Sequence, residues 1–172
     1  LPSGECCFRM RRASSYLALK NYAKSLEDFS VAILINPNAE AYYKRGVFYL
    51  DINYYQKAND DLDKALKLDN TNGFSYFYRG TSYLLLGNYL DAVSDFNMAL
   101  TFDSKDFDAM LGLALSYNKL NDIKNAKLYF QRSESIVSSN IAVKNVEAFK
   151  NTYWFQKQYF YFNENFEKLS KL

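Results

Sequence analysis

The sequence repeats its own chemistry at a fixed interval, and this repeat limits the fold more than any other feature. The residues Ala58, Ala92 and Ala126 follow one another at intervals of 34 residues. The other positions that match at this interval include Gly46, Gly80 and Ala114; Tyr49, Tyr83 and Tyr117; and Leu62, Phe96 and Phe130. An earlier copy, shortened by one residue, contains Ala13, Tyr16, Phe29 and Pro37. Recurrence at this length predicts an architecture in which each copy packs on its neighbours.

Each copy reads as two helices joined by a tight turn. Apolar residues recur at intervals of three and four, which predicts helices throughout and no strands. The two helical stretches of the four copies are separated at Lys20, Asn53, Gly87 and Asn121. Glycine and asparagine at such positions suit the left-handed backbone conformation that ends a helix. One such hairpin cannot bury both of its faces, so we expect neighbouring hairpins to stack.

The repeat resembles the tetratricopeptide repeat family, which has small and aromatic residues at set places of a 34-residue unit. The copy that matches the family best reads Tyr76, Gly80, Tyr83, Gly87, Tyr89, Ala92, Phe96, Ala99. The resemblance implies an all-α fold, a right-handed α-solenoid of stacked antiparallel helix hairpins. It places four repeats in residues 5–140, at about 5–38, 39–72, 73–106 and 107–140. Departures from the family pattern are mild: Lys20 stands at the turn glycine, and Ser25 and Ser133 replace alanines.

Residues 141–172 do not form a fifth copy, and we interpret them as a C-terminal capping helix followed by an aromatic-rich extension. A first apolar stripe runs through Ala142, Val146, Phe149 and Tyr153 and predicts a cap on the fourth repeat. A second stripe, rotated relative to the first, runs from Phe155 to Leu169, so the helix either bends near residues 151–152 or presents two apolar faces. The extension has more large rings than one cap needs. We consider three destinations for them: the chain's own groove, a second copy, or another domain. The candidate self-association residues are Trp154, Phe155, Tyr159, Phe162 and Phe166.

The resemblance also implies where a partner binds. In this family the first helices of successive hairpins line a concave groove that takes an extended peptide or a helix of another protein. The groove residues predicted by position are Tyr43, Lys44, Val47, Leu50, Phe74, Phe77, Tyr78, Leu84, Leu85, Leu111, Leu115 and Asn118. The family's clamp for acidic chaperone tails needs several cationic and amide side chains, and only Lys44 falls on those positions. We therefore expect an apolar or amphipathic segment rather than an acidic tail.

Composition excludes several other classes of function. The chain of 172 residues has a net charge of +2, which does not suit a dedicated nucleic-acid binder, and Arg9, Arg11 and Arg12 read as a solvated helix face. It has no histidine, and its two cysteines, Cys6 and Cys7, are adjacent, so we expect no metal site, no cofactor and no enzymatic activity. No apolar run is long enough to enter a membrane as a span. The cysteine pattern does not suit a disulfide-built secreted protein, and a cytoplasmic location is favoured.

These observations favour a protein–protein interaction scaffold or adaptor that binds a peptide or an amphipathic helix in its groove. Two alternatives stay open. The chain could be a self-assembling structural module, with a homodimer formed through the C-terminal helix, or a chaperone-like protector of a hydrophobic client.

Overall fold

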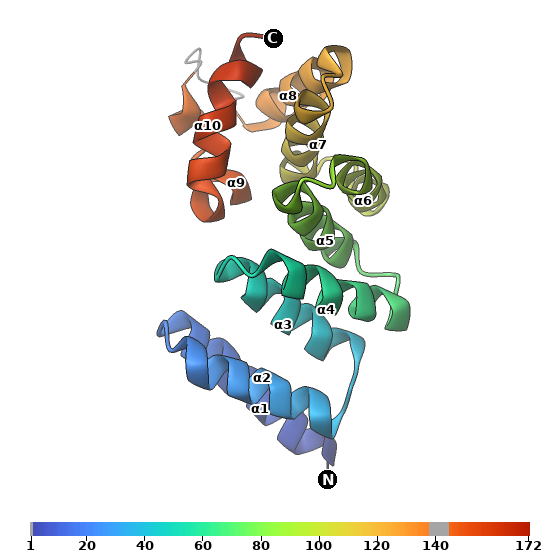
Figure 1. Ribbon diagram of the computed structural model, residues 1–172, viewed down its shortest axis with the longest axis vertical. Coiled ribbons are helices and arrows are strands. Elements are labelled where there is room, and N and C mark those ends of the chain that lie inside the picture. Colours follow the sequence, from blue (N-terminus) through green and yellow to red (C-terminus); the bar gives the residue numbers. More distant parts are fainter. Residues whose placement is uncertain (1, 138–144) are drawn as a thin grey trace. The chain divides into compact units, whose positions relative to one another are not determined.

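The computed structural model describes residues 2–137 and 145–172, and the elements within them are all helices (Figure 1). The first eight are α1 (Pro2–Ala18), α2 (Tyr22–Ile35), α3 (Ala39–Asp51), α4 (Tyr55–Leu68), α5 (Gly73–Leu86), α6 (Tyr89–Phe102), α7 (Phe107–Lys119) and α8 (Ile123–Val137). The tail contains a 3₁₀ turn, η1 (Val146–Phe149), then α9 (Tyr153–Lys157) and α10 (Tyr159–Ser170). The predicted all-α fold of helix hairpins is confirmed. The chain divides into two compact units, Leu1–Ser82 and Tyr83–Leu172.

The turns inside the four copies have the same backbone geometry. Lys20, Asn53, Gly87 and Asn121 all have positive φ angles, from 57° to 85°. In each copy the next residue donates its N–H to a carbonyl five residues earlier, as in the bond from Asn21 to Tyr16 (2.8 Å). This bond closes the end of the preceding helix. The four predicted turn positions are therefore confirmed, including the one where lysine replaces glycine.

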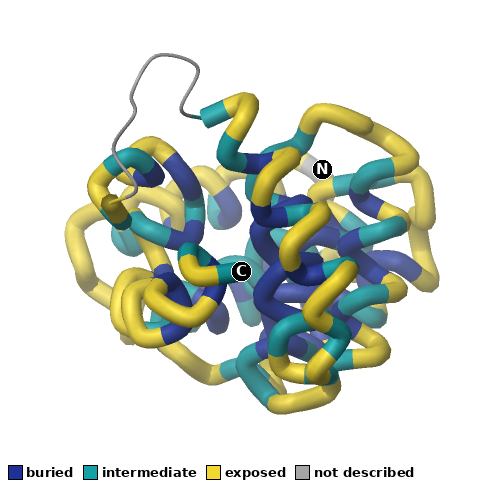
Figure 2. Tube along the Cα trace, turned by 90° about the horizontal axis from the view of Figure 1, so that it is seen from above, coloured by how far each residue is buried: buried dark blue, intermediate teal, exposed yellow. Residues whose placement is uncertain are grey.

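Small residues bring the two helices of a hairpin close together. A Cβ atom added at Gly46 on α3 would lie 2.7 Å from Cγ of Leu62 on α4, nearer than real Cβ contacts allow. Ala58 and Ala65, on the same helix as Leu62, are buried. Buried and exposed residues alternate along the helices, while the turn residues Lys20, Asn53, Gly87 and Asn121 are exposed (Figure 2). The small residues identified in the repeat thus act as packing positions.

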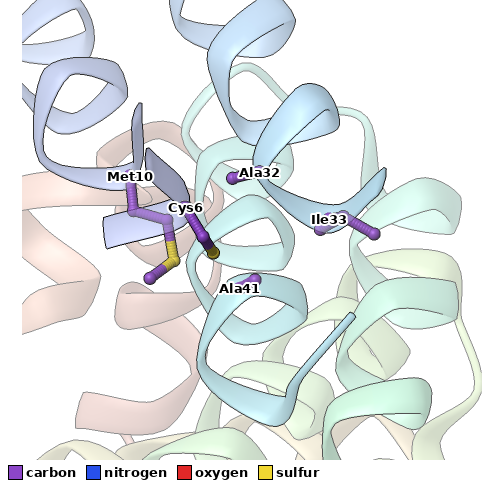
Figure 3. Close-up of a cluster of buried hydrophobic side chains, with 5 residues drawn as sticks. All are labelled: Cys6, Met10, Ala32, Ile33 and Ala41. Atoms are coloured by element: carbon purple, nitrogen blue, oxygen red, sulfur yellow. The ribbon is translucent and has the colours of Figure 1, made fainter. Parts of the chain in front are cut away.

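Successive hairpins of the first unit stack through a small apolar cluster. Cys6 and Met10 on α1 lie beside Ala32 and Ile33 on α2 and Ala41 on α3, and all five are buried (Figure 3). The neighbouring Cys7 is exposed, and both cysteines are free thiols. This cluster joins the first hairpin to the first helix of the second.

Arginine–aspartate pairs tie together the hairpins of the first unit. The guanidinium of Arg12 on α1 donates to both carboxylate oxygens of Asp28 on α2, at 2.6 and 2.7 Å. Arg45 on α3 binds Asp61 on α4 in the same way, at 2.6 and 2.9 Å. The expectation of a solvated arginine face is corrected in part: Arg11 and Arg12 are exposed, but Arg9 (3.2 Å) and Arg12 both bind the buried Asp28 carboxylate. Both aspartates are buried, so the pairs lie inside the hairpins.

The tail of the second unit packs through a cluster of rings. Phe149, Phe162 and Phe166 from the tail lie edge-on or stacked against one another and against Phe130 of α8, with ring centroids 5.6–6.0 Å apart. The predicted bend near residues 151–152 coincides with the start of α9, where the Thr152 hydroxyl accepts the N–H of Phe155 (3.2 Å). A second break follows at Gln158. The predicted limit between repeats and tail, at residues 140 and 141, and Ala142 of the first stripe lie outside the described residues.

Candidate functional site

The structure divides the predicted groove residues into a buried and an accessible set. Five of them are buried and offer no surface, which corrects their assignment as exposed: Leu50, Phe77, Leu84, Leu111 and Leu115. Their side chains pack between helices, and apolar periodicity does not distinguish such positions from an exposed groove. The accessible set consists of Tyr43, Lys44, Val47, Phe74, Tyr78, Leu85 and Asn118.

An aromatic cluster in the first unit contains three of these accessible residues. Tyr43 on α3 lies beside Tyr78 on α5, with ring centroids 5.9 Å apart. Phe74, one turn before Tyr78 on α5, is 68% exposed. Burial raises the pKa of Tyr43 to about 12, and the nearby hydroxyl of Tyr78 adds to this effect. The Tyr43 hydroxyl therefore stays neutral at ordinary pH and can donate a hydrogen bond to a ligand.

A cavity of about 200 Å³ adjoins this cluster. Its lining residues are Ala39, Glu40, Tyr43, Lys44, Asp69, Asn72 and Ser75. The ammonium of Lys44 forms an ion pair with the carboxylate of Glu40 on the same helix, at a distance of 3.0 Å between Nζ and Oε1. The Asp69 carboxylate accepts the N–H (2.9 Å) and the hydroxyl (2.6 Å) of Thr71, and these bonds lower its pKa. The cavity thus has an aromatic wall and a polar rim with one more carboxylate than ammonium.

The candidate self-association residues also divide in two. Trp154, Phe162 and Phe166 are buried within the chain's own second unit, which corrects their assignment to a surface between two copies. Phe155 is partly exposed, and Tyr159 is exposed. The ring of Tyr159 contacts both Phe155 (5.0 Å between centroids) and Phe160 (5.9 Å). These three rings form the exposed aromatic side of the tail.

Asp108, at the start of α7, has the most unusual environment among the carboxylates of the second unit. Its Oδ1 atom accepts the backbone N–H of Tyr153 (2.8 Å), and its backbone carbonyl accepts the indole N–H of Trp154 (2.8 Å). Burial raises the pKa of Asp108 to about 7, and Asp106 adds to the rise, while the N–H of Tyr153 opposes it. Sequence analysis did not single out this residue, because its partners lie 45 and 46 residues further along the chain.

The Arg–Asp pairs were also missed, although the sequence contains a signal for them. Arg12 and Arg45 are 33 residues apart, as are Asp28 and Asp61, and each arginine precedes its aspartate by 16 residues. This regularity is visible once charged residues are compared at the repeat interval, alongside the apolar ones.

Neither a metal cluster nor a membrane-spanning helix is found in the described part of the chain. Within residues 2–137 and 145–172, no three histidine, cysteine or acidic side chains gather as metal ligands would. No helix in these residues is both long and apolar enough to cross a lipid bilayer.

Comparison with known proteins identifies the repeat. One family model described as tetratricopeptide repeat matches residues 39–72, and a second with the same description matches residues 108–133. A curated relative is RNA polymerase II-associated protein 3 of Xenopus tropicalis, 42% identical over 59 residues. That alignment covers 34% of this chain and only 9% of the relative's length.

Several solved structures match a larger part of this chain than the curated relative does. A crystal structure of MamA protein superposes with a TM-score of 0.77 at 18% identity, covering 98% of this chain and 91% of that one. The Arabidopsis OM64 TPR domain gives a TM-score of 0.62 at 26% identity, covering 65% of this chain and 93% of that domain. A structure of the APC/C hetero-tetramer Cut9-Hcn1 gives a TM-score of 0.69 at 18% identity, covering 77% of this chain and 27% of that one. At such low identity, the likeness to MamA and Cut9-Hcn1 shows the fold alone.

Proposed function

Because this chain is a tetratricopeptide repeat protein, we propose that it is a protein-binding module whose first unit receives a segment of another protein beside α3 and α5. The proposed role is non-enzymatic: the chain brings partners together and performs no chemistry on them. The fold supports protein interaction in general, and the accessible residues of the first unit support this particular place.

The observation that carries the proposal is an aromatic cluster next to a cavity, in which Phe74 is exposed and Tyr43 and Tyr78 are half-buried. Phe74, Tyr43 and Tyr78 present rings on neighbouring helices, and Tyr43 also lines the cavity. Aromatic side chains supply much of the binding energy at protein interfaces, because they bury a large area at low entropic cost. A neighbouring cavity allows one partner side chain to anchor. Together these features suit a peptide or amphipathic helix with an apolar anchor residue.

The charged residues at the rim of the cavity indicate which charge a partner segment should have. Lys44 is already paired with Glu40, while Asp69 lies exposed at the other side of the cavity. A partner segment with a lysine or arginine near its apolar anchor would place that charge close to Asp69. An acidic segment would meet two carboxylates there, so we expect it to bind less well.

The test compares two exposed apolar residues of the first unit. Phe74→Ser removes a ring of the proposed site, and Leu34→Ser alters a residue of α2 that is 82% exposed and is not among the groove residues. The immobilised full chain and both variants are used to capture proteins from a cell extract. We expect at least one protein that wild type and Leu34→Ser retain and Phe74→Ser loses.

Calorimetry with that purified partner then measures the effect. Phe74→Ser should weaken binding by at least about tenfold, which corresponds to about 1.4 kcal/mol. Equal affinity of wild type, Leu34→Ser and Phe74→Ser for every captured protein would place the binding surface elsewhere.

A further inference from the structure

The chain's own tail contacts both ends of one face of α7. Asp108, Leu111, Leu115 and Lys119 follow one another at helical spacing and therefore share one face of α7. At the first end, Asp108 binds the backbone N–H of Tyr153 and the indole of Trp154.

At the other end of the same face, the ammonium of Lys119 lies over the ring of Tyr161, 5.7 Å from its centroid. Leu111 and Leu115 lie between these two anchored ends, and both are fully buried. Figure 1 shows α9 and α10 beside α7 and α8, in agreement with these contacts. The tail therefore extends along this face from Asp108 to Lys119.

The tail has the chemistry of a helix-in-groove ligand. Its inner side carries the buried Trp154, Phe162, Phe166 and Leu169. Its outer side carries exposed polar residues: Asn163, Glu164, Glu167 and Lys168. An amphipathic segment with aromatic anchors at such spacing is a common type of ligand for helical repeat surfaces.

The tail is also less firmly built than the hairpin that it covers. The α7–α8 hairpin has its own packing, in which Ala114 and Ala126 are buried and the Ser133 hydroxyl donates to the carbonyl of Phe107 (3.0 Å). By contrast, the first helix of the tail, α9, has only five residues, and a break at Gln158 separates it from α10. Helices of this length are marginal in isolation, so their order depends on the rings docked beneath them. Local opening of such a segment needs less free energy than opening of the hairpin.

We propose that residues 153–170 are a resident ligand of the α7 face, and that this face binds an aromatic-rich amphipathic helix of a partner once the tail has left it. The partner is defined by the tail that it replaces: a helix with a leading tryptophan or tyrosine and two or three further rings on one side. This surface consists of residues of the second unit, whereas the aromatic cluster belongs to the first. The present proposal can therefore be tested independently of the proposed function.

The chain contains its own reporter for tail docking. Trp154 is the single tryptophan of the sequence and is fully buried, so its emission shifts to the red when the tail leaves α7. Two variants loosen the tail and keep this reporter. Phe166→Ala removes the tail ring that packs on Phe130, and Phe162→Ala removes a buried ring of the tail cluster, so the α7 face itself is unchanged in both. Phe160→Ala is the matched control, since that ring is 88% exposed on the same helix as Phe162.

The probe is a fluorescein-labelled peptide of residues 151–172 of this chain, and its binding to each full-length protein is followed by anisotropy. We expect Phe166→Ala and Phe162→Ala to show red-shifted tryptophan emission with retained far-UV circular dichroism. Both should bind the peptide at least tenfold more tightly than wild type and Phe160→Ala, in which the resident tail competes.

Three results would overturn the proposal. Red-shifted emission without peptide binding would mean that the vacated face is no binding surface. Loss of helical signal in both variants would make the tail an integral part of the fold. Unchanged emission and equal peptide binding in all four proteins would mean that neither contact holds the tail in place.

Discussion

The first two hairpins are tied by buried charges, whereas the fourth has apolar and aromatic side chains at the matching positions. Arg12 and Arg45 pair with Asp28 and Asp61 inside the first two hairpins. In the fourth copy, Leu113 stands at the repeat position of these arginines and Tyr129 at the repeat position of these aspartates. Leu113 is fully buried, and Tyr129 stacks on Tyr117 with ring centroids 5.8 Å apart. The same backbone arrangement is therefore held by two kinds of interaction.

The difference follows from what each kind of interaction contributes. A bidentate Arg–carboxylate pair adds little net stability, because both ions lose their hydration, but it strongly disfavours any other register of the two helices. Arg45 also donates to Ser30 on α2 (3.2 Å), and so joins two neighbouring hairpins as well. Rings contribute more stability and less directional preference. The first unit thus keeps an accessible surface beside α3 and α5, while the second covers α7 with its own rings.

The largest expected effect comes from removing one member of a buried pair. Arg45→Ala leaves Asp61 buried without its cation, and we expect a loss of about 3–5 kcal/mol in unfolding free energy. Urea titration followed by far-UV circular dichroism measures it. Replacing both members, as Arg45→Met with Asp61→Leu, should restore most of the stability, because no uncompensated charge is then buried.

Arg12→Ala tests how much the cost of such a substitution depends on burial of the arginine. The Arg12 side chain is 42% exposed, against 17% for Arg45, and Arg9 also reaches the Asp28 carboxylate. The remaining arginine and solvent can compensate the charge, so Arg12→Ala should cost less than Arg45→Ala. Equal losses from the two variants would contradict the role given to burial.

In the second unit, the contrast is between two phenylalanines on one helix. Phe162→Ala removes a fully buried ring and should cost about 3–5 kcal/mol, whereas Phe160→Ala should change stability by less than about 0.5 kcal/mol. Trp154 fluorescence in a urea titration reports on their surroundings. Similar effects of the two substitutions would mean that the tail is not packed as the structure shows.

Much of the fold is readable from the sequence because the repeat is a local property. The turns at Asn53 and Gly87 follow from residue type and interval alone, and so do the small residues such as Gly46 that allow close helix packing. The break at Gln158 within the tail was not predicted, since apolar spacing continues across it. Helical periodicity identifies faces but does not reveal where a helix stops in an unrepeated segment.

The candidate site was only partly predictable, because exposure depends on contacts far apart in the sequence. Phe74 and Phe77 are both apolar residues of α5, yet one is exposed and the other is buried. The contacts of Asp108 with Tyr153 and of Lys119 with Tyr161 depend on a tail that lies more than 30 residues away along the chain. Sequence analysis offered the chain's own groove as one destination for the tail's rings. Trp154 and Phe162 are in fact buried in their own unit.

The property that distinguishes the two units most clearly is their response to pH. The carboxyl of Asp108 has a pKa raised to about 7 by burial, while an unfolded aspartate titrates near 4. Its contribution to stability is therefore full below pH 4 and is lost as the pH rises through about 7. The neighbouring Asp106 acts in the same direction, because burial also raises its pKa. In the first unit the hydrogen bonds from Arg12 lower the pKa of Asp28, so that contribution is present above about pH 4 and is lost on acidification.

Urea titrations at several pH values, followed by Trp154 fluorescence, should therefore show a second unit that weakens between pH 4 and pH 8. Asp108→Asn keeps an oxygen that can accept the Tyr153 N–H and removes the charge. It should flatten this dependence and make tail docking firmer than in wild type at pH 8. A wild-type profile that is flat, or that rises with pH, would mean that the Asp108 carboxylate is solvated and that the tail leaves α7 more often than its buried rings imply.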